Sequence, residues 1–126
     1  MTVVLDASAM LAFLQHEQGH DRVAEVLDRA KISSVNAAEV YSKLSDTGLA
    51  RQDIADSLTA IGIECVAFDL ELALASGELR ATTRHRGLSL GDRACLALAA
   101  HLNAAVLTTD RSWRGLDIGI EIVQIR

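Results

Sequence analysis

Proline is absent from this chain of 126 residues, and its eight glycines are an ordinary number for the length. Linkers and disordered tails are usually rich in Pro, Gly or Ser, so nothing indicates such a segment. Half of the residues are apolar, which is enough for a substantial core. We therefore expect a single domain covering residues 1–126.

The chain also lacks an excess of positive charge and any long apolar run. Its formal net charge is −5, which argues against binding nucleic acid by general positive charge but leaves local basic patches open. No apolar run approaches the ~20 residues that a membrane-spanning helix requires. The N-terminus has no basic stretch of the kind that precedes a signal peptide. We expect a cytoplasmic protein that does not enter a membrane.

Cysteines and aromatic residues are scarce. Cys65 and Cys95 each lie in an apolar segment, which predicts small buried thiols rather than a zinc site or a disulfide. Aromatic residues make up 3% of the chain, too few for a platform on which bases stack. We expect Trp113 to pack beneath the loop that contains Asp110.

Apolar runs of strand length alternate with helical periodicity along the whole chain. Ser8, Ser34 and Asp69 are expected to cap helices, and Gly62 and Asn103 to end them. The strands are expected at residues 2–5, 31–33, 63–68, 104–108 and 118–125. The first four helices are expected at residues 8–15, 23–30, 34–44 and 54–61. A fifth helix should start at residue 69, with Leu70, Ala73, Leu74 and Gly77 facing inward, and an Ala-rich sixth helix should begin near Asp92 and end at about residue 102. This alternation predicts an α/β fold, a three-layer α/β/α sandwich with a mainly parallel sheet of 4–5 strands. The strand order cannot be deduced.

Four acidic residues are placed to meet at one edge of such a sheet. Asp6 and Asp110 each follow a buried strand directly. Glu39 lies early in a helix that follows a strand, and Asp92 lies in the first turn of the Ala-rich helix. Because the carboxyl ends of parallel strands share one edge, where such sheets bind ligands, we expect all four in one crevice.

Carboxylates gathered in this way repel one another. Two of them ~5 Å apart repel by roughly 3 kcal/mol at an effective dielectric constant near 20. Oxygen ligands alone suit Mg²⁺ or Mn²⁺ rather than Zn²⁺. Each acid also has a simpler interpretation: Asp6 as a turn or helix-capping residue, Glu39 as part of a solvated helix face, Asp92 as the acid of a capping box with Ser89, and Asp110 as the start of a turn.

The ordered motifs resemble those of the PIN-domain ribonucleases, and in particular the VapC toxins of bacterial and archaeal toxin–antitoxin pairs. The resemblance covers the whole chain and rests on four segments: Val3-Val4-Leu5-Asp6-Ala7-Ser8-Ala9, Ala37-Ala38-Glu39-Val40, Leu88-Ser89-Leu90-Gly91-Asp92 with the Ala-rich helix after it, and Val106-Leu107-Thr108-Thr109-Asp110.

The resemblance implies a PIN-like fold and hydrolysis of RNA by a water that Mg²⁺ or Mn²⁺ activates. Asp6, Glu39, Asp92 and Asp110 match the family's acidic quartet, with Asp6 and Asp110 as direct metal ligands. Ser8 and Thr108 match positions that often carry small hydroxyl groups, and Asn36 is placed to touch a metal-bound water. No histidine is placed as a general base.

RNA must approach this acidic crevice along basic residues. Phosphates could be guided by Arg80, Arg84, Arg86, Arg93 and Arg111, although a solvated charge run explains residues 84–86 equally well. The family further implies a homodimer and a small cognate antitoxin that lies across the active-site groove. The first helices, around Met10, Phe13 and Leu14, are candidates for that contact.

Two other functions remain open. One is a different Mg²⁺-dependent phosphohydrolase, although the second Asp of the haloacid-dehalogenase pattern is here Ser8. The other is a PIN-like module that binds RNA or a protein without cleavage, although such a module has no need of four mutually repelling acids. The RNA target, cleavage site, number of metal ions and identity of the antitoxin are not readable from the residues.

Overall fold

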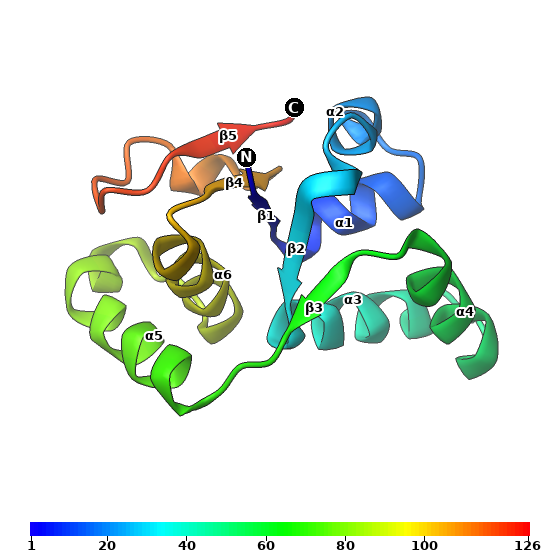
Figure 1. Ribbon diagram of the computed structural model, residues 1–126, viewed down its shortest axis with the longest axis horizontal. Helices are drawn as coiled ribbons and strands as arrows, with labels where there is room; N and C mark the ends of the chain where they lie inside the picture. Colours follow the sequence, from blue (N-terminus) through cyan, green and yellow to red (C-terminus); the bar gives the residue numbers. More distant parts are fainter.

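A five-stranded sheet, all parallel, forms the centre of the computed structural model, which describes residues 1–126 (Figure 1). The strand order is β3-β2-β1-β4-β5, so β1 lies in the middle with β2 and β4 beside it. The strands are β1 (Val3–Leu5), β2 (Ala30–Ser33), β3 (Glu64–Val66), β4 (Ala105–Thr108) and β5 (Ile122–Gln124). The predicted α/β architecture and parallel pairing are confirmed.

Six α-helices cover the two faces of the sheet (Figure 1). They are α1 (Ala7–Leu14), α2 (His20–Ala24), α3 (Ser34–Asp46), α4 (Arg51–Ile61), α5 (Leu70–Thr83) and α6 (Leu90–Leu102). Short 3-10 helices occur at Leu27–Arg29, Arg84–Arg86 and Arg111–Trp113. No helix is both long enough and apolar enough to cross a membrane.

Alternation along the strands creates two hydrophobic cores. Val3 and Leu5 point to the face covered by α1 to α4, whereas Val4 points to the face covered by α5 and α6. Trp113 belongs to the second core and is buried, as predicted. Helix α6 is buried from Ala94 to Ala99, which confirms that an Ala- and Leu-rich helix packs centrally.

Several helix ends differ from the expected ones because other side chains provide the caps. Asp6, not Ser8, caps α1, since its carboxylate accepts a hydrogen bond from Ala9 N. Ser33, not Ser34, caps α3, and the Ser34 hydroxyl instead accepts a hydrogen bond from Phe68 N. Asp69, Gly62 and Asn103 occupy the predicted capping positions.

Three of the expected elements are shorter in the structure than the sequence predicts. The helix expected at residues 23–30 is replaced by α2 and a 3-10 turn, because Ala30 already pairs with Val3 as part of β2. Strand β5 begins at Ile122 rather than at residue 118, after Gly119 has taken a positive φ of 75° that interrupts extended backbone. Strand β3 likewise covers 64–66 rather than 63–68.

Helix α5 presents a different face to the core from the expected one. Its buried residues are Leu72, Ser76 and Thr83, while Leu70 and Leu74 are 74% and 60% exposed. Leucines lie on both sides of this helix, so periodicity could not choose the buried side. Cys65 is exposed, contrary to expectation, and Cys95 is buried; both thiols are free.

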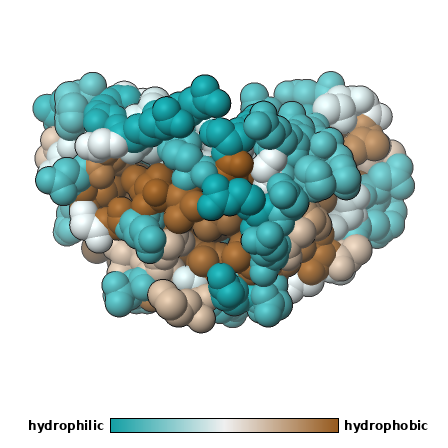
Figure 2. Space-filling view, turned by 90° about the horizontal axis from the view of Figure 1, so that it is seen from above, coloured by the Kyte–Doolittle hydropathy of each residue, from teal (hydrophilic) through white to brown (hydrophobic).

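Apolar residues also reach the surface elsewhere. Figure 2 shows the molecule from above relative to the view in Figure 1, and apolar patches lie between hydrophilic side chains on this face. Such exposure is ordinary for a folded protein, because polar residues are too few to cover it completely.

Candidate active site

A cleft of about 200 Å³ lies where β1 and β4 end and where α1, α3 and α6 begin or pass. All four predicted acids line it: Asp6 after β1, Asp110 after β4, Glu39 on α3 and Asp92 on α6. The remaining lining residues are Ala7, Ser8, Leu11, Asn36 and Lys43. The structure therefore brings the four acids together at the carboxyl edge of the sheet.

Asp6 is the most buried of these acids, with 5% of its surface exposed. Its Oδ1 accepts hydrogen bonds from Ser8 Oγ at 2.7 Å and Ala9 N at 2.8 Å, and its Oδ2 accepts one from Thr108 Oγ1. Burial raises the pKa of Asp6 to about 6, and the charge of Asp92 adds to this. The three hydrogen bonds stabilise the charged form and oppose the shift.

The hydroxyl groups of Ser8 and Thr108 join the ends of β1 and β4. Thr108 Oγ1 accepts a hydrogen bond from Asp110 N at 2.9 Å, and Ser8 Oγ accepts one from Thr109 N at 2.9 Å. Asp110 Oδ1 in turn accepts from Ser112 N and Ser112 Oγ, so this acid does open a turn. Its Oδ2 makes no hydrogen bond within the protein and remains available to a ligand.

Asp92 is the acid of a capping box with Ser89. Its Oδ2 accepts a hydrogen bond from Ser89 N at 2.9 Å, and Ser89 Oγ accepts one from Asp92 N at 3.2 Å. The capping role and a role in the cleft are compatible, because the cap uses a single carboxylate oxygen. The same holds for Asp6, which caps α1 while facing the cleft.

Glu39 is half-buried and is held by Asn36, whose Nδ2 donates to Glu39 Oε1 at 2.7 Å. The same Nδ2 donates to the carbonyl oxygen of Gly91 at 3.0 Å, which ties α3 to α6. Glu39 therefore does not lie on a freely solvated helix face.

The electrostatic influence of the acids reaches the core beneath them. The pKa of the buried Cys95 thiol is raised well above its usual value, first by burial and then by the charges of Asp6, Asp92 and Glu39. One thiol thus experiences three carboxylates contributed by three separate elements. This convergence of negative charge is what a bound cation would neutralise.

The donor set fits a hard divalent cation. Each of the four acids offers carboxylate oxygen, and the buried Oδ1 of Asn36, beside the cleft, has no hydrogen-bond partner. In the present side-chain conformations, no three His, Cys, Asp or Glu side chains are close enough to share one ion. The carboxylates would therefore have to move closer together before three of them could share an ion.

The basic residues divide into two groups. Arg86 donates to the carbonyl oxygens of Ser112 and Arg114, and Arg93 donates to that of Ser76, so both support the fold. Lys43, which the sequence reasoning missed, is the only basic residue lining the cleft, and it makes no ion pair or hydrogen bond. Its position four residues after Glu39 on α3, on the same helix face, was the signal that could have identified it.

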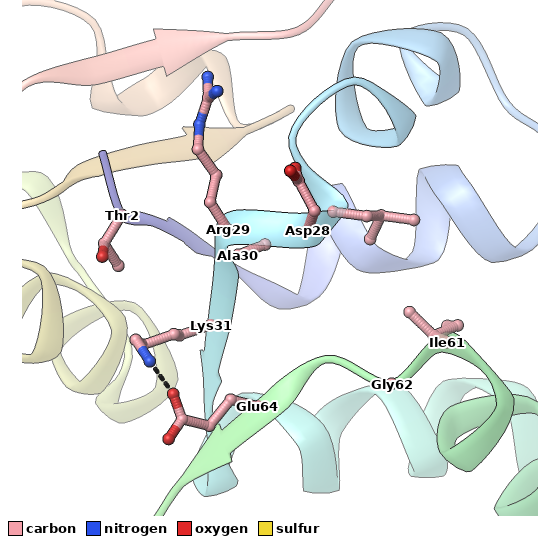
Figure 3. Close-up of a pocket in the computed structure, with 9 residues that line it drawn as sticks. Thr2, Asp28, Arg29, Ala30, Lys31, Ile61, Gly62 and Glu64 are labelled. Carbon is pink, nitrogen blue, oxygen red and sulfur yellow. Dashed lines mark ion pairs between the residues drawn. The ribbon is translucent and has the colours of Figure 1, made fainter.

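A larger cavity of about 430 Å³ lies at the opposite edge of the sheet (Figure 3). It is lined by residues around the starts of β2 and β3, where Lys31 and Glu64 form an ion pair. Those charges satisfy each other, and parallel sheets bind ligands at the carboxyl edge rather than the amino edge. The smaller, acid-lined cleft is therefore the better candidate.

The expected partner surface on α1 needs a correction. Met10 is completely buried and belongs to the first core, so it cannot contact a partner. It lies on the inward face of α1 with Ala9 and Ala12, a choice of face that the short apolar run did not reveal. Phe13 and Leu14 are half-buried.

Comparison with known proteins places these observations in a family. The family model described as PIN domain matches residues 3–119. No curated protein matches the chain significantly.

Solved structures with the same fold include chains of toxin–antitoxin complexes. DNA-bound VapBC from Salmonella typhimurium has a TM-score of 0.77 at 20% identity, covering 100% of this chain and 99% of that one. A toxin–antitoxin complex from Klebsiella pneumoniae has a TM-score of 0.77 at 16% identity, covering 99% and 98%. VapBC-5 from Mycobacterium tuberculosis has a TM-score of 0.63 at 25% identity, covering 98% and 99%. Its structural neighbours include chains of VapBC complexes, and the chain belongs to the PIN-domain family.

Proposed function

We propose that this protein is a Mg²⁺- or Mn²⁺-dependent ribonuclease and the toxin of a VapBC-type toxin–antitoxin pair. The observation that carries the proposal is the cleft at the carboxyl edge of the sheet, lined by Asp6, Glu39, Asp92 and Asp110 in a chain of the PIN-domain family. Four carboxylates around one small cleft are costly unless a cation neutralises them.

The metal would be held by Asp6, Asp92, Asp110 and Glu39, with Asp6 and Asp110 as direct ligands. When bound, such an ion activates a water and offsets the negative charge that develops on a phosphodiester during in-line displacement. Ser8 and Thr108 orient the Asp6 carboxylate by donating to its two oxygens. Asn36 fixes Glu39 in the same way.

RNA enters a negatively charged cleft, so its phosphates need a nearby cation from the protein. Lys43 is exposed at the cleft and has no partner of its own, so we assign it a phosphate contact. Arg80, Arg84 and Arg111 are exposed and are proposed to guide RNA from further away. A contribution from Arg86 or Arg93 requires the release of its contacts within the fold.

Support for the proposed partners comes from the neighbouring structures, which include toxin–antitoxin complexes, some of them bound to DNA. We propose a small cognate antitoxin that covers the acidic cleft and a homodimer of this chain. We further propose that residues 1–126 act as one PIN-like domain in the cytoplasm.

The alternative function is a PIN-like module that binds RNA or a protein without cleavage. In the present side-chain conformations, no three carboxylates are close enough to share one ion, and this observation favours the alternative. The two functions differ in whether a divalent ion makes the protein cleave RNA.

The test is an RNA cleavage assay with Mg²⁺, Mn²⁺ or EDTA, on structured and single-stranded substrates. We expect cleavage only with a divalent ion, and a loss of at least a hundredfold in Asp6→Asn. Cleavage that persists both in EDTA and in Asp6→Asn would show that a contaminant or another mechanism is responsible. Binding without any cleavage under all conditions would support the alternative.

A further inference from the structure

We propose that Gly91 is a positioning residue of the active site, whose missing side chain lets the Glu39 carboxylate lie against the first turn of α6. The proposal rests on the proposed function, in which Glu39 acts beside Asp92. Gly91 is buried, immediately precedes Asp92 in α6, and lies against the Glu39 carboxylate.

The space at Gly91 is already occupied by the Glu39 carboxylate. A Cβ atom added to Gly91 would lie 2.4 Å from Glu39 Oε1 and 2.5 Å from Glu39 Oε2. Contacts this short between a Cβ and another heavy atom essentially do not occur. Even alanine at position 91 therefore requires the Glu39 carboxylate to move away from α6.

The backbone of Gly91 holds the same arrangement from the other side. Its carbonyl oxygen accepts a hydrogen bond from Asn36 Nδ2, which also donates to Glu39 Oε1. Asn36 is 1% exposed, so this amide cannot exchange these partners for bulk water. Both acceptors are oxygens, which sets the orientation of the amide. Glu39, Asn36 and Gly91 thus form one unit that joins α3 to α6.

Backbone conformation does not explain a glycine at this position. The residue lies in the first turn of α6 without a positive φ, so the backbone there is open to residues other than glycine, which loses more conformational freedom on folding than alanine does. Gly77 in α5 is a matched case: it also lies in a helix without a positive φ, but an added Cβ would meet nothing within 4 Å. Gly77 is exposed in the middle of its helix, whereas Gly91 is buried in the first turn of its own. The difference that the experiments use is that a carboxylate fills the Cβ position only at Gly91.

The first experiment measures thermal stability in EDTA for Gly91→Ala, Gly77→Ala, Glu39→Ala and the double variant Gly91→Ala/Glu39→Ala. Gly77→Ala should raise the melting temperature by about 4 °C, the usual gain from alanine in a helix of a domain this size. Gly91→Ala should show no gain or a loss in the wild-type background. In the Glu39→Ala background its effect on the melting temperature should be more favourable than in the wild-type background, because the carboxylate no longer fills the Cβ position. Equal gains from Gly91→Ala in both backgrounds would overturn the proposal.

The second experiment measures Mn²⁺ affinity by the loss of the electron paramagnetic resonance signal of free Mn²⁺. We expect Gly91→Ala to weaken binding about tenfold and Gly77→Ala to leave it unchanged. Unchanged affinity in Gly91→Ala would overturn the positioning role. Absence of Mn²⁺ binding by the wild type would instead contradict the proposed function, and the stability comparison in EDTA would still decide whether Gly91 positions Glu39.

Discussion

Thr108 and Asp6, 102 positions apart in the chain, are joined by a buried hydrogen bond from the threonine hydroxyl to Asp6 Oδ2. The same hydroxyl accepts a hydrogen bond from Asp110 N. One oxygen atom therefore connects two of the four acids and sets the relative position of the ends of β1 and β4. This bond contributes to both stability and the charge state of the site.

Thr108→Val should show what this hydroxyl contributes. Valine keeps the shape and the strand preference but leaves Asp6 Oδ2 and Asp110 N without this partner, so we expect a loss of about 2 kcal/mol in the free energy of unfolding. The pKa of Asp6 should rise further, because the removed bond lowers it. Urea denaturation and carboxyl NMR titration measure the two effects. A fully stable variant with an unchanged Asp6 titration would contradict the described role.

Asp6→Asn should become more stable relative to the wild type as the pH rises, when no metal is bound. The pKa of Asp6 is about 6 in the folded protein, against 3.8 for an ordinary Asp side chain in the unfolded chain. Between these two pH values the folded state therefore holds a proton that the unfolded state has released. The contribution of Asp6 to the free energy of unfolding is fully present below about pH 4 and is lost as the pH rises through about 6. The asparagine variant does not ionise, so in EDTA its free energy of unfolding relative to the wild type should rise by roughly 3 kcal/mol between pH 4 and pH 7. A pH-independent cost is superimposed on this rise, because the amide nitrogen cannot accept the hydrogen bond that one carboxylate oxygen accepts.

The control for this experiment is Asp69→Asn. Asp69 also caps a helix through its side chain, since it accepts from Leu72 N, but it is exposed. It therefore reports the effect of changing a capping carboxylate without the effect of burial. If both variants gave the same pH dependence of unfolding, burial of Asp6 would not be the cause.

Mn²⁺ should stabilise the wild type more than Asp92→Asn. A ligand that binds only the folded protein stabilises it by about 2.7 kcal/mol at a hundred times its dissociation constant, which corresponds to roughly 8–10 °C here. Asp92→Asn keeps a hydrogen-bonding side chain for the cap but removes a charge from the cleft. The exposed Asp53→Asn in α4 removes an equal charge elsewhere and should respond like the wild type. Equal thermal shifts in all three proteins would exclude Asp92 from the metal site.

Lys43→Gln should weaken RNA binding without affecting metal binding. Anisotropy of a labelled single-stranded RNA, measured in EDTA at several salt concentrations, should show a severalfold loss of affinity. The slope of log K against log salt should decrease by about 0.7 for the lost phosphate contact. Lys31→Gln changes the same charge at the far edge of the sheet, where Lys31 pairs with Glu64, and should leave the slope unchanged. The same decrease for both lysines would indicate general electrostatics rather than a contact.

The two cysteines should react at very different rates. Cys65 is exposed on β3, whereas Cys95 lies in the core beneath the acids. A thiol reagent should therefore modify one group per chain quickly under native conditions and the second only on unfolding. Mass spectrometry of the native reaction identifies the residue, and rapid labelling of Cys95 would contradict the packing of α6 against the sheet.

The local pattern of apolar and polar residues was sufficient to predict the fold class and the acids of the cleft. The alternation of apolar strands with amphipathic helices determined the parallel α/β class. The four acids that line the cleft were identifiable from their positions: Asp6 and Asp110 follow strands, and Glu39 and Asp92 lie early in helices. These features are readable because a parallel sheet brings the ends of its strands to a common edge, whatever the order of the strands.

Only the tertiary structure decided which sides of the helices are buried and how the site is joined together. It buried Met10, exposed Leu70 and placed Lys43 at the cleft, because the inward face of a short or uniformly apolar helix depends on its neighbours. The hydrogen bond between Thr108 and Asp6 and the contact between Glu39 and Gly91 join residues 102 and 52 positions apart. Such contacts depend on distances between separate elements, and those distances exist only once the sheet and its helices have packed.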